Sequence, residues 1–243
     1  ITENESAPVI TLATSHTTVA EDSGATITLT ATSSQAADEA ITVTLASTGT
    51  AINGTDYSSF DGQTITISAN STTGTITGTP TDDLIYEGDE VATIAISNVS
   101  GIDATESGTQ SVSITITENE SAPVITLATS HTTVAEDSGA TITLTATSSQ
   151  IADEDVIVTL STSGTATDGT DYSSLNGQTI TIGAGLTTGT ILMSLIDDSV
   201  YETAGVSEGI TIEISSVSGG GATESGTQWV NITITDNESA PII

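Results

Sequence analysis

Apolar and polar residues alternate along most of the chain with a period of two, which is the period of a β-strand with one buried face. The alternating runs are separated by clusters of Gly, Asn, Asp and Ser, which are typical of turns. No run has a helical period of useful length. In the first half of the 243-residue chain, the runs predict strands at residues 8–14, 26–33, 41–47, 63–67, 74–79, 91–97 and 110–117.

The second half of the chain repeats the first. Residues 1–35 recur without one change as residues 116–150, an offset of 115 residues. A three-residue insertion follows Glu202, and from there the offset is 118. A period of this length indicates tandem globular domains, because the repeats of a solenoid run about 20–45 residues. From the near-identity of the two repeats we expect that they belong to a longer array. The expected domains are residues 6–120 and 121–238, and the expected ends of flanking repeats are residues 1–5 and 239–243.

Seven short strands in a repeat, separated by turns, form the pattern of an immunoglobulin-like sandwich. We therefore predict an all-β protein made of two tandem seven-stranded antiparallel β-sandwiches in an end-to-end rod. Aromatic residues make up only 2% of the chain. The cores must then consist of Val, Ile, Leu, Ala and Thr methyl groups, which bury less apolar area per residue than aromatic rings do.

The charge of the chain has one sign only. The sequence holds 32 Asp and Glu residues and no Lys or Arg, for a formal net charge of -32. Nothing in it can neutralise phosphates, which excludes nucleic acid as a partner, and anionic membrane surfaces are disfavoured. Phosphate loops and Schiff-base chemistry are excluded for the same reason. The absence of Cys excludes disulfides and thiolate metal sites, and the apolar runs are too short for a membrane-spanning helix.

The acidic residues of each repeat are expected to meet at one end of the sandwich. If successive strands alternate in direction, then the start of the second strand, the loops after the third and fifth strands, and the end of the seventh strand share one end. The acids at these places in the first repeat include Asp22 and Asp89, and the candidate ligands among them are Glu21, Asp56, Asp82, Asp83, Glu87, Glu90, Glu118 and Glu120. The acids there in the second repeat include Asp137, and the candidate ligands among them are Glu136, Asp171, Asp197, Asp198, Glu202, Glu208, Asp236 and Glu238.

Carboxylates crowded together without a basic side chain favour a hard cation. Ca²⁺ takes 6–8 oxygen ligands from carboxylates and carbonyls, whereas Mg²⁺ keeps its waters and needs strict octahedral geometry. We predict that these sixteen acids are metal ligands and that about two to four Ca²⁺ ions bind to each domain. The other interpretation, solvated loop acids, is less consistent with their grouping at one end in both repeats.

Four motifs in order resemble the Calx-β domain family, over nearly the whole of both repeats. They are VAEDSG at 19–24, GTAINGTDY at 49–57, DDLIYEGDE at 82–90 and the closing ITITE at 114–118. The resemblance implies a seven-stranded sandwich that binds Ca²⁺ at its distal loops, with Glu21, Asp56, Asp82, Asp83, Glu87 and the acids after the last strand as ligands. The family usually ends in consecutive aspartates, whereas this chain has Glu118-Asn119-Glu120 and Asp236-Asn237-Glu238.

Tandem repeats of this kind resemble the extender region of large bacterial adhesins that are secreted by the type I route. The resemblance implies an extracellular, cell-surface protein, with neighbouring repeats of the same chain as its partners and a monomeric rod as its form. The last strand of a repeat leaves among the acids, so the linker up to Pro123 passes the predicted ions. We therefore expect bound Ca²⁺ to stiffen the junction between domains.

Two other functions are weighed against this one. The Thr-x-Thr runs could form a direct adhesive or ice-binding surface, although Thr suits any exposed strand face. Thermal hysteresis in solution would distinguish that function. A glycosidase would use a pair of carboxylates, but the acids here are crowded and aromatic residues for sugar stacking are scarce. We expect no enzymatic activity.

Overall fold

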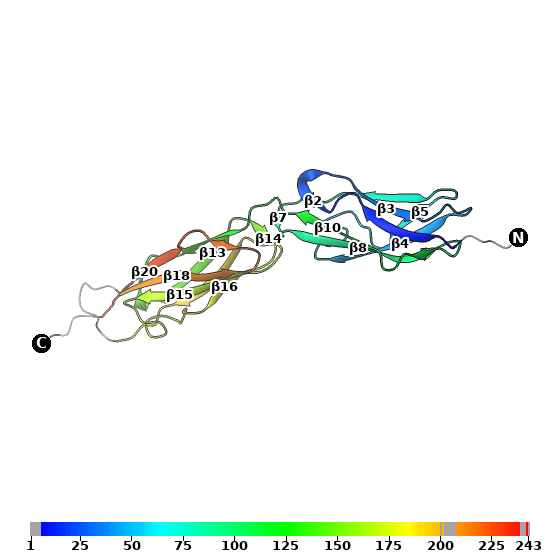
Figure 1. The fold of residues 1–243 in the computed structure, drawn as a ribbon. Helices are drawn as coiled ribbons and strands as arrows, with labels where there is room; N and C mark the ends of the chain where they lie inside the picture. The colour runs from blue at the N-terminus through cyan, green and yellow to red at the C-terminus, as the bar shows by residue number, and fades with distance from the viewer. Residues whose placement is uncertain (1–5, 200, 202–207, 239–241, 243) are drawn as a thin grey trace. The chain divides into compact units, whose positions relative to one another are not determined.

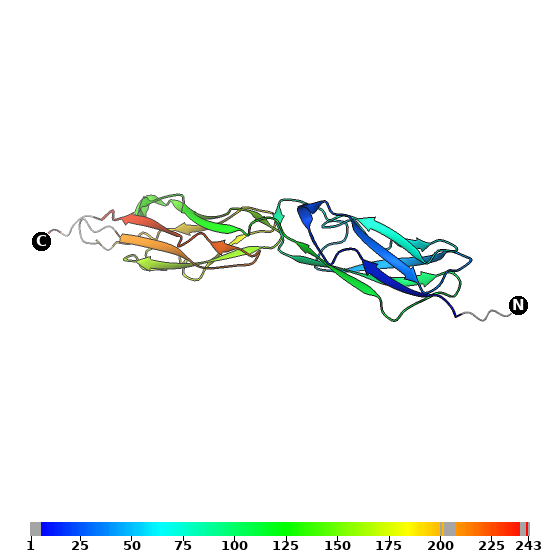
Figure 2. The same cartoon turned by 45° about the horizontal axis from the view of Figure 1, so that its top comes forward.

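The computed structural model describes residues 6–199, 201, 208–238 and 242. Contacts divide the chain into two compact units, Ile1–Leu84 with Gly88–Asn119 and Ile85–Glu87 with Glu120–Ile243. Strands dominate both units, and each unit is a sandwich of two sheets (Figures 1 and 2). This confirms the predicted all-β sandwich class.

The first unit packs a four-stranded sheet against a five-stranded one. The smaller sheet has the order β6 (Thr73–Gly78), β3 (Ile27–Ser33), β1 (Val9–Thr14) and β9 (Thr105–Glu106). The larger sheet has the order β2 (Thr18–Ala20), β10 (Ser111–Thr117), β8 (Glu90–Ser100), β4 (Ile41–Gly49) and β5 (Thr64–Ile67).

All seven runs predicted for the first repeat overlap one of these strands. The structure adds short strands that alternation alone does not predict. After β1 the chain crosses to the other sheet, where β2 pairs in parallel with β10, and β9 pairs in parallel with β1. These parallel pairs extend the antiparallel ladders at the edges of both sheets.

The second unit repeats this topology. Its smaller sheet has the order β17 (Thr188–Ser194), β13 (Thr141–Ser148), β11 (Val124–Thr129) and β19 (Thr223–Glu224). Its larger sheet has the order β12 (Thr133–Ala135), β20 (Trp229–Thr235), β18 (Glu208–Ser218), β15 (Val156–Gly164) and β16 (Thr179–Ile182). A two-stranded parallel sheet pairs β7 (Ile85–Tyr86) with β14 (Ile151–Ala152).

The core of each unit lies between its two sheets and consists mainly of Ile, Leu, Val and Ala side chains. In the first unit, the rings of Tyr57 and Phe60 are buried with their centroids 6.0 Å apart. A Cβ added to Gly78 would stand 2.7 Å from Phe60 Cζ, so the ring fills the space that a side chain at Gly78 would need. The second unit has Leu175 and Met193 at the equivalent positions, both buried.

The only helices among the described residues are two single 3-10 turns, η1 (Glu21–Ser23) and η2 (Glu136–Ser138). Neither is long enough and apolar enough to span a bilayer. Both turns lie directly before the second main strand of their unit and begin with an acidic residue. They therefore fix the backbone at Glu21 and at Glu136, two of the predicted metal ligands.

Candidate metal centres

The η1 turn brings Glu21 into the protein interior. Ser23 Oγ donates to the carbonyl of Ala20 at 2.6 Å, and Gly24 ends the turn in the left-handed conformation, with a φ of 58°. Glu21 is thereby only 7% exposed. A buried carboxylate is costly unless a cation or a proton neutralises it. The chain has no Lys or Arg that could supply this cation.

Three carboxylates of the first repeat form what we call the Glu21 cluster. One oxygen each of Glu21, Glu118 and Glu120 lies within 4.8 Å of the other two. Glu118 follows β10 directly and is held on both sides: Gly88 N–H donates to Glu118 Oε2 at 2.9 Å, and Glu118 N–H donates to Asp89 Oδ1 at 3.1 Å. The loop before β8 and the end of β10 are thus joined at this cluster.

The Asp56 cluster consists of Asp56, Glu87 and Glu90, and one carboxylate oxygen of each lies within 4.8 Å of one from each of the other two. Asp56 is 6% exposed and lies in the turn after β4. Its backbone N–H donates to the carbonyl of Ile52 at 3.1 Å, and Ile52 N–H donates back to Asp56 Oδ2. These bonds orient the Asp56 carboxylate toward the acids that flank the start of β8.

In the second unit, the Glu136 cluster contains Glu136, Asp197 and Glu238. Glu136 is 9% exposed and begins η2, in the place that Glu21 has in η1. The hydrogen bond between the side chains of Glu238 and Asp236, followed by burial and the proximity of Glu136, raises the pKa of Glu238 to about 7. Carboxylates this close disfavour each other's charge, so negative charge is concentrated at this cluster.

The other predicted ligands lie outside these three clusters. Asp82 accepts a 3.5 Å hydrogen bond from the side-chain amide of Asn119, and Asp171 accepts one of 2.6 Å from the N–H of Thr167. Glu202 lies outside the described residues. The remaining predicted ligands, which stand in none of the three clusters, are Asp83, Asp198, Glu208 and Asp236. The full set of sixteen ligands stays a prediction.

Asparagine residues at these sites have roles that composition does not predict. The side-chain amide of Asn119 donates to Asp82. The side-chain amide of Asn237, oriented so that its O and its N both have hydrogen-bond partners, donates to Glu136 Oε1 at 2.7 Å. In the sequence, both residues interrupt what would otherwise be a run of acidic residues. Their position between two acids that follow the closing strand is the signal that could have identified them as polar partners of the cluster.

Acids elsewhere have plainer roles in loop structure. Asp168 accepts hydrogen bonds from Ser174 Oγ at 2.6 Å and from the N–H of Leu175 at 2.8 Å. Burial would raise the pKa of Asp168, but these hydrogen bonds outweigh it and leave the pKa lowered. Asp61 and Asp155 likewise accept bonds from backbone N–H groups.

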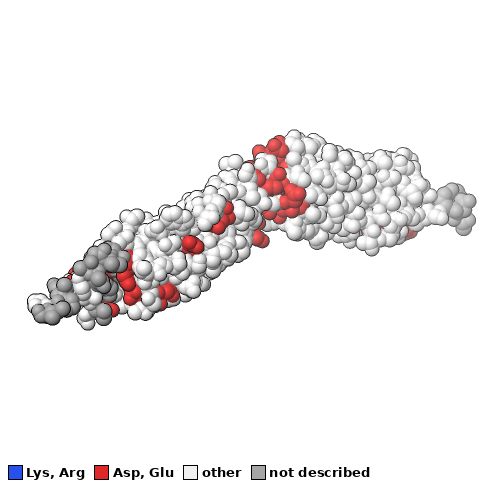
Figure 3. Space-filling model, turned by 60° about the vertical axis from the view of Figure 1, so that its left-hand side comes forward, with Lys and Arg blue, Asp and Glu red and all other residues white. Residues whose placement is uncertain are grey.

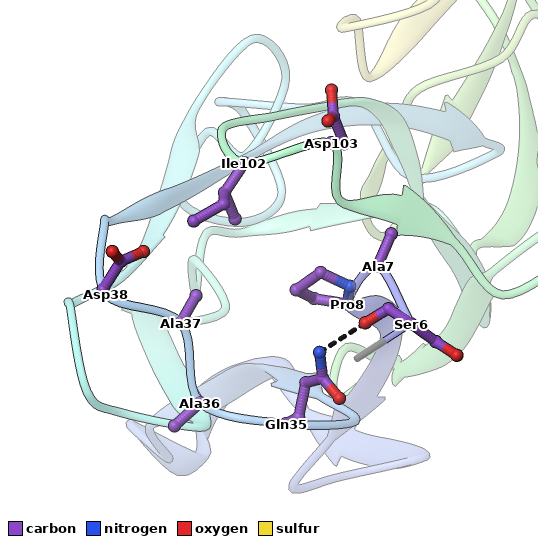
Figure 4. Close-up of a pocket in the computed structure, with 9 residues that line it drawn as sticks. All are labelled: Ser6, Ala7, Pro8, Gln35, Ala36, Ala37, Asp38, Ile102 and Asp103. Carbon is purple, nitrogen blue, oxygen red and sulfur yellow. Dashed lines mark hydrogen bonds between the residues drawn. The ribbon is translucent and has the colours of Figure 1, made fainter. Parts of the chain in front are cut away.

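A pocket of about 670 Å³ lies near the start of β1 (Figure 4). The Gln35 side chain donates to the carbonyl of Ser6 across it. Its lining residues are Ser6, Ala7, Pro8, Gln35, Ala36, Ala37, Asp38, Ile102 and Asp103. None of them belongs to an acidic cluster, so this pocket has no part in the candidate metal centres.

The arrangement of the clusters suits a hard divalent cation. Acidic side chains gather in patches on the surface, with no basic side chain among them (Figure 3). Each cluster combines one buried carboxylate with two others at ligand spacing. Oxygen-only donors with several carboxylates match the chemistry of Ca²⁺. The residues present therefore fit a Ca²⁺ ion.

The Calx-beta domain matches the sequence twice, over residues 3–120 and 118–238. Among solved structures, CBD12 from CALX1.2 is similar over 85% of this chain and 82% of that chain, with 19% identity and a TM-score of 0.40. The apo-form Calx CBD1 domain is similar over 47% of this chain and 98% of that chain, with 23% identity and a TM-score of 0.38. The Yersinia pseudotuberculosis adhesin InvE is similar over 93% of this chain and 58% of that chain, with 14% identity and a TM-score of 0.38. No curated protein matches the sequence.

Proposed function

Because this chain belongs to the Calx-beta domain family, whose members bind calcium, we propose that it is a calcium-stiffened structural repeat of a cell-surface adhesin. In this proposal Ca²⁺ occupies the acidic clusters of each domain and restrains the junction that follows the closing strand. The repeats then act as an extender that holds a terminal binding region away from the cell. Calx-beta domains are calcium-binding rather than catalytic domains.

The observation that carries the proposal is the burial of one carboxylate in each cluster of a chain without Lys or Arg. Glu21, Asp56 and Glu136 are each less than a tenth exposed. A carboxylate buried among other carboxylates is costly to keep ionised, and a bound cation removes much of that cost. Ca²⁺ bound by Glu21, Glu118 and Glu120 would neutralise the Glu21 cluster, and Ca²⁺ bound by Asp56, Glu87 and Glu90 would do the same for the second cluster.

Chain connectivity links these ions to the junction. Glu118 and Glu120 follow the end of β10, and β11 begins at Val124. A cation held by Glu120 therefore restrains a residue that lies four positions before the next strand. Pro123 fixes φ within that short segment and leaves it little freedom. Ion binding at the Glu21 cluster would thus reduce the range of angles open to the linker.

The extender role rests on the repeat itself. Neighbouring repeats share an identical stretch of 35 residues, as expected for an array in which every unit does the same mechanical work. The lack of Lys and Arg removes all sites for trypsin-like proteases, which suits an exposed extracellular rod. We propose a secreted, bacterial, monomeric protein in which the partners of each repeat are its neighbours.

Thermal unfolding in EDTA, in millimolar Ca²⁺ and in millimolar Mg²⁺ tests the ion sites, and small-angle scattering under the same conditions tests the junction. We expect a large rise in Tm that is specific to Ca²⁺, since a ligand that binds only the folded state stabilises it. We also expect the maximum dimension to become larger and better defined with Ca²⁺. An unchanged Tm would refute the ion sites. A raised Tm with unchanged scattering would refute only the stiffening.

A further inference from the structure

The outer face of β20 and β18 carries a pair of side chains that the first unit lacks. Trp229 on β20 stands directly opposite Glu213 on β18. The equivalent pair in the first unit is Ser111 opposite Ala95. Two small side chains in one repeat are thus replaced together by a large aromatic and a carboxylate in the other.

Trp229 adds nothing to the core. It is the only Trp of the chain and is 55% exposed, whereas Ile232 on the opposite face of the same strand is buried. Exposure of so large an aromatic surface is unfavourable in water, and aromatic residues with this property are enriched at recognition surfaces. A role in binding accounts for Trp229 where a role in packing does not.

Glu213 gives the patch its chemistry. Side chains directly opposite each other in an antiparallel pair have Cβ atoms about 4.5–5.5 Å apart, so the carboxylate and the indole ring are within reach of one bound group. No Lys or Arg exists in this chain to pair with it. An indole face next to a carboxylate is the combination that binds a guanidinium group, through cation–π attraction and a charge-assisted hydrogen bond.

The neighbouring side chains are polar and uncharged. Thr211 Oγ1 donates to Asn231 Oδ1 at 2.9 Å, and these two residues form the next outward-facing pair along the strands. They provide a hydrogen-bonding rim beside the aromatic ring. The net charge of -32 attracts basic partners and repels acidic ones.

We propose that Trp229 and Glu213 form a docking site for an arginine side chain on the surface of a basic partner protein. The guanidinium stacks on the indole and pairs with the Glu213 carboxylate. The site uses none of the acidic clusters, so it is independent of the calcium proposal. The first unit, with Ser111 and Ala95 in these places, lacks the site.

The fluorescence of the single Trp reports on this site directly. We would titrate the chain, in millimolar Ca²⁺, with hexa-arginine peptide and with the neutral hexa-citrulline peptide of the same length. We expect a saturable change in the Trp229 fluorescence with hexa-arginine and no change with hexa-citrulline. Glu213→Gln keeps the fluorophore and should weaken arginine binding about threefold to tenfold.

Matched variants exclude general electrostatic attraction. Glu39→Gln removes one exposed carboxylate of the first unit and should leave the affinity unchanged. Trp229→Ser, measured by anisotropy of a labelled peptide, should weaken binding about as much as Glu213→Gln does. It should fold, since Ser111 is tolerated at the same place. Equal effects of Glu39→Gln and Glu213→Gln would overturn the proposal. So would a fluorescence response to a neutral hexasaccharide with none to hexa-arginine, which would indicate a glycan platform.

Discussion

The backbone N–H of Gly88 donates a 2.9 Å hydrogen bond to Glu118 Oε2, and this bond joins the loop before β8 to the residue that follows β10. The bond in the other direction, from Glu118 N–H to Asp89 Oδ1, measures 3.1 Å. Glu118 therefore has two functions that a substitution can separate. Its carboxylate belongs to the Glu21 cluster, while its backbone and one oxygen hold the loop in place.

Glu118→Gln should weaken Ca²⁺ binding while preserving the loop. The amide oxygen of Gln can still accept from Gly88, but the negative charge is lost. We expect the Ca²⁺ affinity of this cluster to fall at least about tenfold, because loss of even an outer-shell partner costs a metal site that much. Calorimetric titration with Ca²⁺ measures the effect. Asp103→Asn, an exposed acid of the pocket in Figure 4, is the control that should not change it, and equal affinities for both variants would argue against a site at Glu118.

Glu21→Gln should change stability in opposite directions with and without calcium. In EDTA the substitution removes a buried negative charge beside Glu118 and Glu120, so the free energy of unfolding should rise. In Ca²⁺ it removes a ligand, so the free energy of unfolding should fall, by about 1–3 kcal/mol. Chemical denaturation in both conditions measures the two effects. Asp22→Asn, which changes an exposed neighbour, should move both values little, and a shift of the same sign in both conditions would count against the ion site.

Much of the fold could be predicted from the alternation of apolar and polar residues, because a strand with one buried face needs an apolar residue at every second position. The crossing of the chain from β1 to β2 could not be predicted. Residues of both strands alternate in the same way, and the switch between sheets depends on pairing with β10, far away in the sequence. Short edge strands such as β9 likewise arise from tertiary pairing rather than from local pattern.

For the candidate site, strand direction predicted that the acids gather, and the structure brings Glu21 together with Glu118 and Glu120. Strand direction alone could not predict which acids share one cluster, since that depends on the direction of each side chain and on hydrogen bonds in the loops. The burial of Asp56, for example, follows from a turn closed by its own bonds with Ile52. No pattern of charges along the chain contains that information.

Phe60 and Gly78 should behave as a coupled pair. A side chain at Gly78 would clash with Phe60, and the second unit solves the same packing problem with Leu175 and Met193. Gly78→Met alone should therefore destabilise the first unit, by about 1–3 kcal/mol. Phe60→Leu with Gly78→Met reproduces the packing of the second unit and should recover most of that loss. Denaturant unfolding of both single variants and the double variant measures the coupling, and strictly additive effects would contradict direct contact.

Glu238 should make the stability of the calcium-free second unit depend on pH near neutrality. Its bond with Asp236, burial and the nearby Glu136 raise its pKa from 4.5 to about 7. A raised pKa in the folded state contributes stability that is fully present below about pH 4.5 and is lost as the pH rises through about 7. In EDTA, the Tm of this unit should therefore fall between about pH 6 and pH 8. Trp229 fluorescence follows the unfolding, since this only Trp lies in the second unit.

Calcium should replace the proton in this cluster. Ca²⁺ binds the ionised carboxylates, so binding near pH 7 should release protons, and the apparent affinity should rise with pH below the pKa of Glu238. Calorimetry in two buffers of different ionisation enthalpy counts the protons. Glu238→Gln should lower the number released and flatten the Tm profile in EDTA, while Glu39→Gln should do neither. A Tm profile that stays steep in Glu238→Gln would assign the pH dependence to other acids and leave the shared proton without support.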